Sequence, residues 1–181
     1  LGREVKLEKL PQQIAVSGRA SLMILDALYM FPEAKERVVA FEALVQGGVN
    51  FIQLLDPQYP EKAFLKRDAG VEQFITAEPD LVLMKSSQAE KFGAPIEALN
   101  IPVVYLDFET PEQYPRDLAI LGQIFGNDAR AQELIQLYQG AVDEINQKVP
   151  AAAAKPNVLV LQTARVAERA QNGAVLLDEA R

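Results

Sequence analysis

The chain has 181 residues, enough for one ordinary domain or for one complete lobe and the beginning of another. Its net charge is −7, and no stripe of Lys and Arg could neutralise phosphates, so we expect no nucleic-acid partner. It contains no Cys and no His, which excludes thiol nucleophiles, Ser-His-Asp triads, ordinary zinc sites and imidazole acid-base catalysis. No apolar stretch approaches the roughly 18 residues of a membrane-spanning helix.

The first elements in chain order alternate between apolar strands and an amphipathic helix. The alternation of Val5 and Leu7 predicts a short edge strand, and the apolar residues 14–16 predict a buried strand. Pro32 ends the helix that follows. The apolar face of this helix carries Leu22, Leu25, Leu28 and Tyr29. Residues 37–41 (RVVAF) are predicted to form the next strand.

Two further strands are predicted in the middle of the chain. Residues 81–84 (LVLM) are a continuous apolar run, and residues 102–107 (PVVYLD) are another, which is typical of strands covered on both faces. Ser87 and Glu90 have the spacing of a capping box, so the helix between these strands is expected to begin there.

Two consecutive helices are predicted beyond residue 107. Thr110 and Gln113 have capping-box spacing and mark the start of the first, although Pro115 could shift that start by one turn. Gly126 ends this helix, and a long helix of residues 127–149 follows. The apolar stripe of the long helix consists of Ala131, Leu134, Ile135, Tyr138, Val142 and Ile145.

This alternation of strands and helices predicts a doubly wound α/β fold with a mainly parallel sheet, a Rossmann-like lobe. We expect an N-terminal lobe of residues 1–126, an inter-lobe helix of residues 127–150, and the incomplete beginning of a C-terminal lobe in residues 151–181. Residues 156–162 (PNVLVLQ) are expected to form one more buried strand. The remainder is too short for a second domain, so we expect the chain to be a fragment.

Ligands of open parallel sheets bind beyond the carboxyl ends of the strands. The residues that follow the predicted strands are therefore the candidate ligand-binding residues, namely Ser17, Arg19, Glu42, Lys85, Ser86, Asp107 and Glu109. Each of them could instead be an ordinary solvated charge or a loop polar group. If Arg19 and Lys85 do serve a ligand, these two cations and the nearby helix N-termini favour a small anionic one.

The residues alone leave an enzymatic hypothesis open. Asp107 and Glu109 could be the acid-base carboxylates of a small doubly wound α/β enzyme, and Tyr59 or Tyr105 could bind ferric iron. Packing and strand-end polarity are the more ordinary roles, because no nucleophile or base accompanies these residues. No G-x-G-x-x-G, Walker or G-x-S-x-G motif is present, so we expect no catalytic residues, no cofactor and no resident metal site.

Several segments together resemble the class III periplasmic binding proteins, the receptors of ABC importers for ferric siderophores, haem and cobalamin. The most specific part is Glu72 on a short helix, followed by Pro79-Asp80 and the apolar strand 81–84. Residues 99–114 (LNIPVVYLDFETPEQY) match a second pattern of that family. The resemblance runs from about Gly2 to Gln162.

The resemblance implies a rigid, bilobal receptor that is not an enzyme. Its lobes would be joined by the helix 127–149, and its ligand would be an iron chelate, haem or cobalamin held between them. The absence of His removes one way of holding haem iron, which favours an iron chelate. The protein would be periplasmic or extracellular and membrane-anchored. It would be a monomer that meets the membrane only through its permease or a lipid anchor.

Glu72 matches by position the glutamate with which the first lobe of such receptors docks onto arginines of the permease dimer. Helical spacing places it opposite Val71, Phe74 and Ile75, so its carboxylate is expected to be exposed. An exposed carboxylate suits bidentate pairing with arginine. The alternative is an ordinary solvated charge on a helix.

Overall fold

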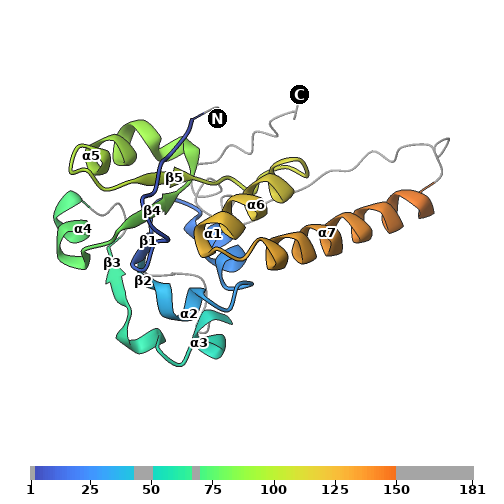
Figure 1. Cartoon of the computed structure of the whole chain (residues 1–181), viewed down its shortest axis with the longest axis horizontal. Coiled ribbons are helices and arrows are strands. Elements are labelled where there is room, and N and C mark those ends of the chain that lie inside the picture. Colours follow the sequence, from blue (N-terminus) through green and yellow to red (C-terminus); the bar gives the residue numbers. More distant parts are fainter. Residues whose placement is uncertain (1–2, 43–50, 67–69, 150–181) are drawn as a thin grey trace, which may run out of the picture. The chain divides into compact units, whose positions relative to one another are not determined.

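A computed structural model of the chain describes residues 3–42, 51–66 and 70–149. In this part, five parallel strands form one sheet: β1 (Ile14–Val16), β2 (Val38–Glu42), β3 (Ala63–Leu65), β4 (Leu81–Met84) and β5 (Val103–Tyr105). Their order is β3-β2-β1-β4-β5, so the chain winds outward from the central β1 in both directions (Figure 1). The prediction of a doubly wound α/β sheet is confirmed.

The winding direction switches between β1 and β4, which are direct neighbours in the sheet. Ile14 pairs with Leu81 and Val16 with Leu83, in a parallel register. Open sheets of this kind bind ligands outside the carboxyl ends of the strands at such a switch point. The first residue after β1 is Ser17 and the first after β4 is Lys85, so both follow the strands at this position.

Helices cover both faces of the sheet, because each strand presents apolar side chains to both sides. Ile14 and Val16 pack on the face covered by α1, α6 and the first turns of α7. Ala15 faces the opposite side, where Phe74 and Ile96 complete a second core. Figure 1 shows α4 and α5, the helices that carry these two residues, across the sheet from α1 and α6. The helices are α1 (Ser21–Leu28), α2 (Ala34–Arg37), α3 (Phe51–Leu55), α4 (Val71–Ala77), α5 (Ala94–Glu97), α6 (Gln113–Phe125) and α7 (Asp128–Lys148).

The junction of α6 and α7 forms as the sequence predicts. Gly126 adopts a left-handed conformation with φ of 68° and ends α6, which glycine does without steric cost. The side-chain oxygen of Asn127 accepts the backbone N–H of Arg130 at 3.1 Å, and its amide nitrogen donates to Glu33 at 2.7 Å. The turn between the two helices is therefore fixed by a capping residue that also contacts the segment before α2.

Residues 3–13 form no strand, so the edge strand predicted at Val5 and Leu7 is wrong. The guanidinium of Arg3 instead donates to the carbonyl of Val103 at 3.4 Å and also pairs with Glu97. The Arg3 side chain thus donates to a carbonyl group of β5 that the backbone N–H of a neighbouring strand would otherwise bind. Leu7 packs at the edge of the core, which accounts for the apolar signal.

The helix predicted to begin at Ser87 is irregular. A 3₁₀ turn, η2 (Ser86–Gln88), and a π-helical segment, η3 (Ala89–Gly93), precede α5, and no side chain caps them. Gly93 ends this π-helical segment, at a place where a side chain would collide with the hydroxyl group of Tyr105.

The long helix α7 lies where the sequence places it, and part of its predicted stripe is buried. Ala131, Leu134 and Ile135 join the core, whereas Ile145 is exposed. The described residues up to Asp143 belong to one compact unit, and the last residues of α7, from Glu144 onward, belong to a second. The strand expected at 156–162 and the expected lobe of residues 151–181 lie outside the described residues. Within the described residues, no helix is both long and apolar enough to cross a membrane.

Candidate functional site

The residues after β1 and β2 form one small polar cluster. The carboxylate of Glu42 is buried and accepts hydrogen bonds from the Ser17 hydroxyl at 3.0 Å and from the Gly18 backbone N–H at 2.8 Å. Gly18 has φ of 93°, which strains any other residue. Glu42 therefore holds the turn after β1. Arg19, the next residue, is exposed and makes no ion pair with any described residue.

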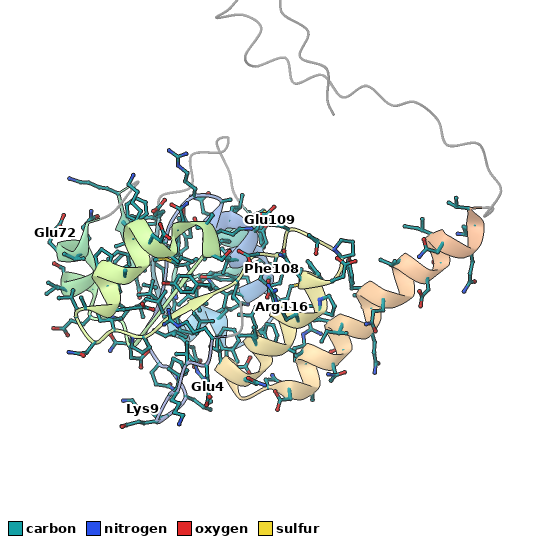
Figure 2. All side chains as sticks on the ribbon, turned by 90° about the horizontal axis from the view of Figure 1, so that it is seen from above. Glu4, Lys9, Glu72, Phe108, Glu109 and Arg116 are labelled. Carbon is teal, nitrogen blue, oxygen red and sulfur yellow. The ribbon has the colours of Figure 1, made fainter. Side chains whose placement is uncertain are left out.

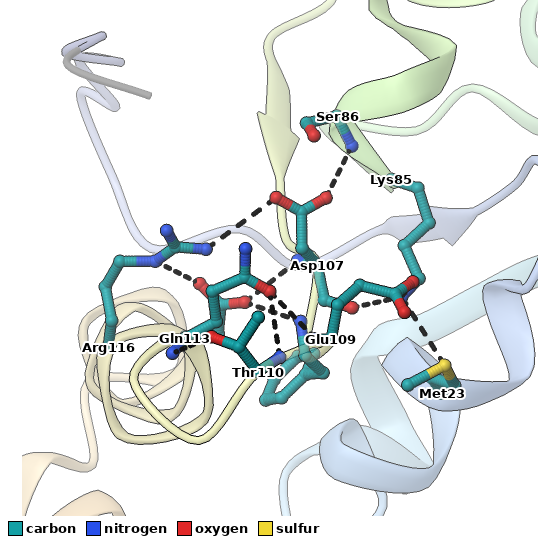
Figure 3. Close-up of polar contacts among 10 residues, drawn as sticks. Met23, Lys85, Ser86, Asp107, Glu109, Thr110, Gln113 and Arg116 are labelled. Atoms are coloured by element: carbon teal, nitrogen blue, oxygen red, sulfur yellow. Dashed lines mark hydrogen bonds and ion pairs between the residues drawn. The ribbon is translucent and has the colours of Figure 1, made fainter. Parts of the chain in front are cut away.

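Lys85 is buried at the end of β4, with 3% of its side chain exposed. Its ammonium group donates to the carbonyl oxygen of Asp107, to the Glu109 carboxylate at 2.6 Å and, weakly, to the sulfur of Met23 at 3.5 Å (Figure 3). Lys85 is therefore neither a solvated surface charge nor a side chain that extends its ammonium group to water. Its charge is already compensated inside the chain, so it is not a free cation for a ligand.

Asp107 joins the ends of β4 and β5. One carboxylate oxygen accepts the backbone N–H of Ser86 at 2.9 Å, and the other lies 3.8 Å from the guanidinium of Arg116 (Figure 3). Lys85, Ser86, Asp107 and Glu109 thus come together in one network, as their places after neighbouring strands predict. The described contacts do not link this network to the cluster of Ser17 and Glu42.

Asp117 holds the turn after β5, and the sequence analysis did not single it out. Its side chain is fully buried, and one oxygen accepts the backbone N–H groups of Asp107 at 2.8 Å and Phe108 at 2.9 Å. The other oxygen accepts the Nε–H of Arg116 at 2.7 Å, and this hydrogen bond raises the pKa of the guanidinium. An Asp in the second turn of α6 carries no sequence signal that distinguishes it from a surface charge.

Phe108 adopts a left-handed conformation with φ of 53°, which is unusual for a bulky residue. Such strain persists only where the surrounding structure over-determines it, and it gathers at functional sites. Here Asp117 binds the Phe108 backbone, while the side-chain oxygen of Gln113 accepts the N–H groups of Glu109 at 2.8 Å and Thr110 at 3.2 Å. Hydrogen bonds to the side chains of Asp117 and Gln113 therefore fix the conformation of the turn that carries Glu109.

An aromatic stack connects this turn with α7. The ring of Phe108 meets Tyr114 edge-on at 5.4 Å between centroids, and Tyr114 stacks on Tyr138 at 4.5 Å. Such pairs add about 0.5–1.5 kcal/mol each beyond the area that they bury. Burial, with smaller contributions from Tyr138 and Asp26, raises the pKa of Tyr114. These three rings therefore pack the turn after β5 against the first half of α7.

Asp26 on α1 offers a test of the electrostatics beside this stack. Its Oδ1 atom is buried without a hydrogen-bond partner, and burial raises the pKa of its carboxyl group. The folded state therefore binds this proton more tightly than the unfolded state does. The stability of the protein falls as the pH rises from below the ordinary pKa of an Asp to above the raised pKa of Asp26. We expect Asp26→Asn to stabilise the protein at pH 7 by up to about 1 kcal/mol and by less at pH 3.

Urea unfolding of both proteins at pH 3 and pH 7 measures this difference. Asp143→Asn changes an exposed carboxylate and serves as the matched control. Equal effects of Asp26→Asn at the two pH values would contradict a raised pKa at this position.

Glu72 lies far from this network, on the exposed face of α4 (Figure 2). Phe74 anchors the helix in the core with 1% exposure, but Ile75 is 56% exposed, so the expectation that Ile75 packs inward is wrong. The helix is only two turns long, and Val71 and Ala77 pack beside Phe74 to attach it. The exposure expected for Glu72 is observed.

A metal site is not apparent in the described part of the chain, where no three acidic residues gather closely enough to hold an ion. The two tyrosines considered as iron ligands have packing roles. Tyr59 packs its ring against Phe41 and Phe64, and Tyr105 lies under the guanidinium of Arg3 at 5.2 Å. The strand ends provide polar side chains and a turn whose conformation is fixed. This arrangement suits binding more than catalysis.

The chain belongs to the periplasmic binding protein family, whose model matches residues 14–181. This match confirms the resemblance seen in the sequence, and it places the chain among substrate-binding proteins and not among enzymes. The hypothesis of a small enzyme that uses Asp107 and Glu109 is therefore wrong. No curated protein matches the chain.

Solved structures share the fold at low sequence identity. FepB, a TroA-like periplasmic binding protein of Veillonella parvula, matches with a TM-score of 0.70 and 18% identity, over 86% of this chain and 49% of its own. IsdE of Staphylococcus aureus, solved with haem, matches with a TM-score of 0.59 and 21% identity, over 79% and 51%. SirA of the same organism, solved with staphyloferrin B, gives 0.56 and 14%, over 78% and 46%. The chain spans about half the length of these structures.

Proposed function

We propose that this chain is part of the solute-binding receptor of an ABC importer, which delivers an iron chelate, haem or cobalamin to a membrane permease. The match to the periplasmic binding protein family over residues 14–181 carries this proposal. The haem bound to IsdE and the staphyloferrin B bound to SirA support haem and a chelate as candidate ligands, whereas cobalamin comes from the family resemblance alone. The receptor acts outside the cytoplasmic membrane, as a monomer, and meets the membrane through its permease or a lipid anchor.

The ligand contacts from this lobe come from the carboxyl ends of β1, β4 and β5. Among the described residues there, Arg19 is exposed and without an ion-pair partner, so it is the cation available to an anionic chelate. Lys85 contributes only if Glu109 moves away from it. The preset turn at Phe108 and Glu109 offers a rigid surface that does not have to become ordered on binding, and this favours affinity.

Glu72 is proposed to dock the receptor onto arginines of the permease dimer. Glu72 is exposed and lies away from Phe108 and Glu109, which separates this role from ligand contacts at that turn (Figure 2). Exposed ion pairs alone contribute about 0–1 kcal/mol, whereas desolvated pairs at an interface lose about 2–5 kcal/mol when one partner is removed. Docking through Glu72 therefore predicts a large and selective mutational effect.

We expect Glu72→Lys in the complete protein to lower transport by about 30-fold or more, because a lysine repels the arginines that the carboxylate binds. Binding of the ligand, chosen by calorimetry from a ferric siderophore, haem and cobalamin, should stay unchanged. Cellular uptake of that ligand measures transport.

Glu36→Lys, the same charge change at an exposed position of α2, is the control and should leave uptake intact. Unchanged uptake by Glu72→Lys would exclude the docking role. The absence of binding to all three ligand classes by the complete protein would exclude the receptor function itself.

A further inference from the structure

The carboxylate of Glu72 lies folded back over Gly70, the residue before α4. A Cβ atom built on Gly70 would overlap both carboxylate oxygens of Glu72. The backbone of Gly70 has φ of −73° and ψ of 165°, an extended conformation that alanine also adopts. Backbone freedom therefore does not explain this glycine. What the absence of a side chain provides is space for the carboxylate of Glu72.

Ile75 lies on the same side of α4 as Glu72, since residues three apart are neighbours on a helix surface. It is 56% exposed, while Phe74 beside it is buried. The hydroxyl of Thr76 donates to the carbonyl of Glu72 at 3.0 Å and leaves the Glu72 side chain free. The outer face of α4 thus presents a carboxylate and a branched apolar side chain next to each other.

This combination matters because an ion pair in open water contributes little to binding. Apolar neighbours that exclude water make such a pair strong, and this is how energetically dominant contacts at interfaces are built. A single exposed isoleucine is ordinary by itself. Its place beside a carboxylate that folds into the space left by Gly70 distinguishes it from the other exposed apolar residues.

We propose that Glu72 and Ile75 form a two-part docking patch on α4, with Gly70 as the residue that positions the carboxylate. The partner is a permease surface that presents a guanidinium group beside an apolar hollow, complementary to the charge and to the side chain of the patch. The proposal rests on the function proposed above. It adds a second contact residue and a positioning residue to that docking role.

Binding of the complete protein, loaded with the ligand chosen by the calorimetry above, to its permease dimer in lipid nanodiscs tests the patch. Ile75→Ser should weaken binding about 10-fold, and Ile75→Leu should retain most of it. Leu54→Ser is the matched control, because Leu54 on α3 is 78% exposed and lies outside the patch. This control should bind as tightly as the unchanged protein.

Gly70→Ala tests the positioning role, because the three atoms nearest to the added Cβ all belong to the carboxyl group of the flexible Glu72 side chain. The midpoint of thermal unfolding should stay the same or rise slightly. Affinity for the permease should fall about 5-fold, and the ¹³C signal of the Glu72 carboxyl group should shift.

The outcomes separate the two proposals. If Glu72→Lys abolishes binding while Ile75→Ser and Gly70→Ala bind normally, docking through Glu72 stands and the patch is refuted. If Glu72→Lys also binds normally, the docking role in the proposed function fails with it. An effect of Leu54→Ser equal to that of Ile75→Ser would likewise refute the patch.

Discussion

Replacing Asp117 by alanine is expected to lower the free energy of unfolding by about 3 kcal/mol or more, the largest effect at the candidate site. The substitution removes the acceptor of the Asp107 and Phe108 backbone N–H groups in a buried place. It also leaves Arg116 without its nearest carboxylate. The left-handed Phe108 then loses the hydrogen bond that holds it. Urea unfolding of the complete protein measures the change.

Two milder variants show which part of the network matters. Asp117→Asn keeps one oxygen for the two N–H groups and should cost less than the alanine variant. Arg116→Ala leaves those two hydrogen bonds in place and removes a side chain that is 39% exposed, so it should cost least. A loss of stability in Arg116→Ala as large as that in Asp117→Ala would contradict the importance of the backbone hydrogen bonds.

Replacing Asp56 by alanine is expected to cost about 3–5 kcal/mol of unfolding free energy, because it breaks a buried ion pair from one side. The carboxylate of Asp56 is fully buried, accepts the hydroxyl of Tyr29 at 2.7 Å and lies 3.4 Å from the ammonium of Lys62, whose side chain is 5% exposed. Without Asp56, the lysine remains buried, and its one remaining partner among the described residues is the carbonyl group of Lys35.

The reciprocal variant is the control for Asp56. Lys62→Met keeps the apolar stem and leaves Asp56 with its hydrogen bonds from Tyr29 and from the backbone of Gln58 at 2.9 Å. It should therefore cost clearly less than Asp56→Ala in the same urea titration. Equal losses for both variants would mean that the ion pair, and not the stranded cation, sets the cost.

The strands that could be predicted from the sequence are those buried on both faces. The segments 14–16 and 81–84 are continuous apolar runs between turn residues, and they form β1 and β4. β3 was missed because two of its three residues are exposed at the edge of the sheet, whereas all three residues of β1 are buried. Conversely, the alternation at Val5 and Leu7 looks like a strand but has no backbone partner. Whether an edge segment forms a strand depends on the strand beside it, and the local sequence pattern carries no information about that strand.

The position of the candidate site was predictable, but the state of its charges was not. The rule that ligands bind at strand ends selects Lys85, Asp107 and Glu109, and the structure brings these residues together. Their mutual pairing depends on the turn at Phe108, which Asp117 sets through backbone hydrogen bonds. Such contacts need the sheet and α6 to be in place, so no spacing in the sequence signals them. The exposure of Glu72, in contrast, was predicted from helical spacing, although the same argument placed Ile75 on the opposite, buried face and was wrong there.

The pairing of Lys85 with Glu109 has a consequence for the kinetics of solute capture. Glu109 compensates the charge of Lys85, and the chain carries a net charge of −7. The described part of the chain therefore has little long-range attraction for anions. Electrostatic steering can accelerate association by 10-fold or more where a cleft carries one sign of charge. An anionic solute would gain no such acceleration at this edge. Its rate of capture would be set by diffusion and by shape, and Arg19 would act only once the solute had arrived.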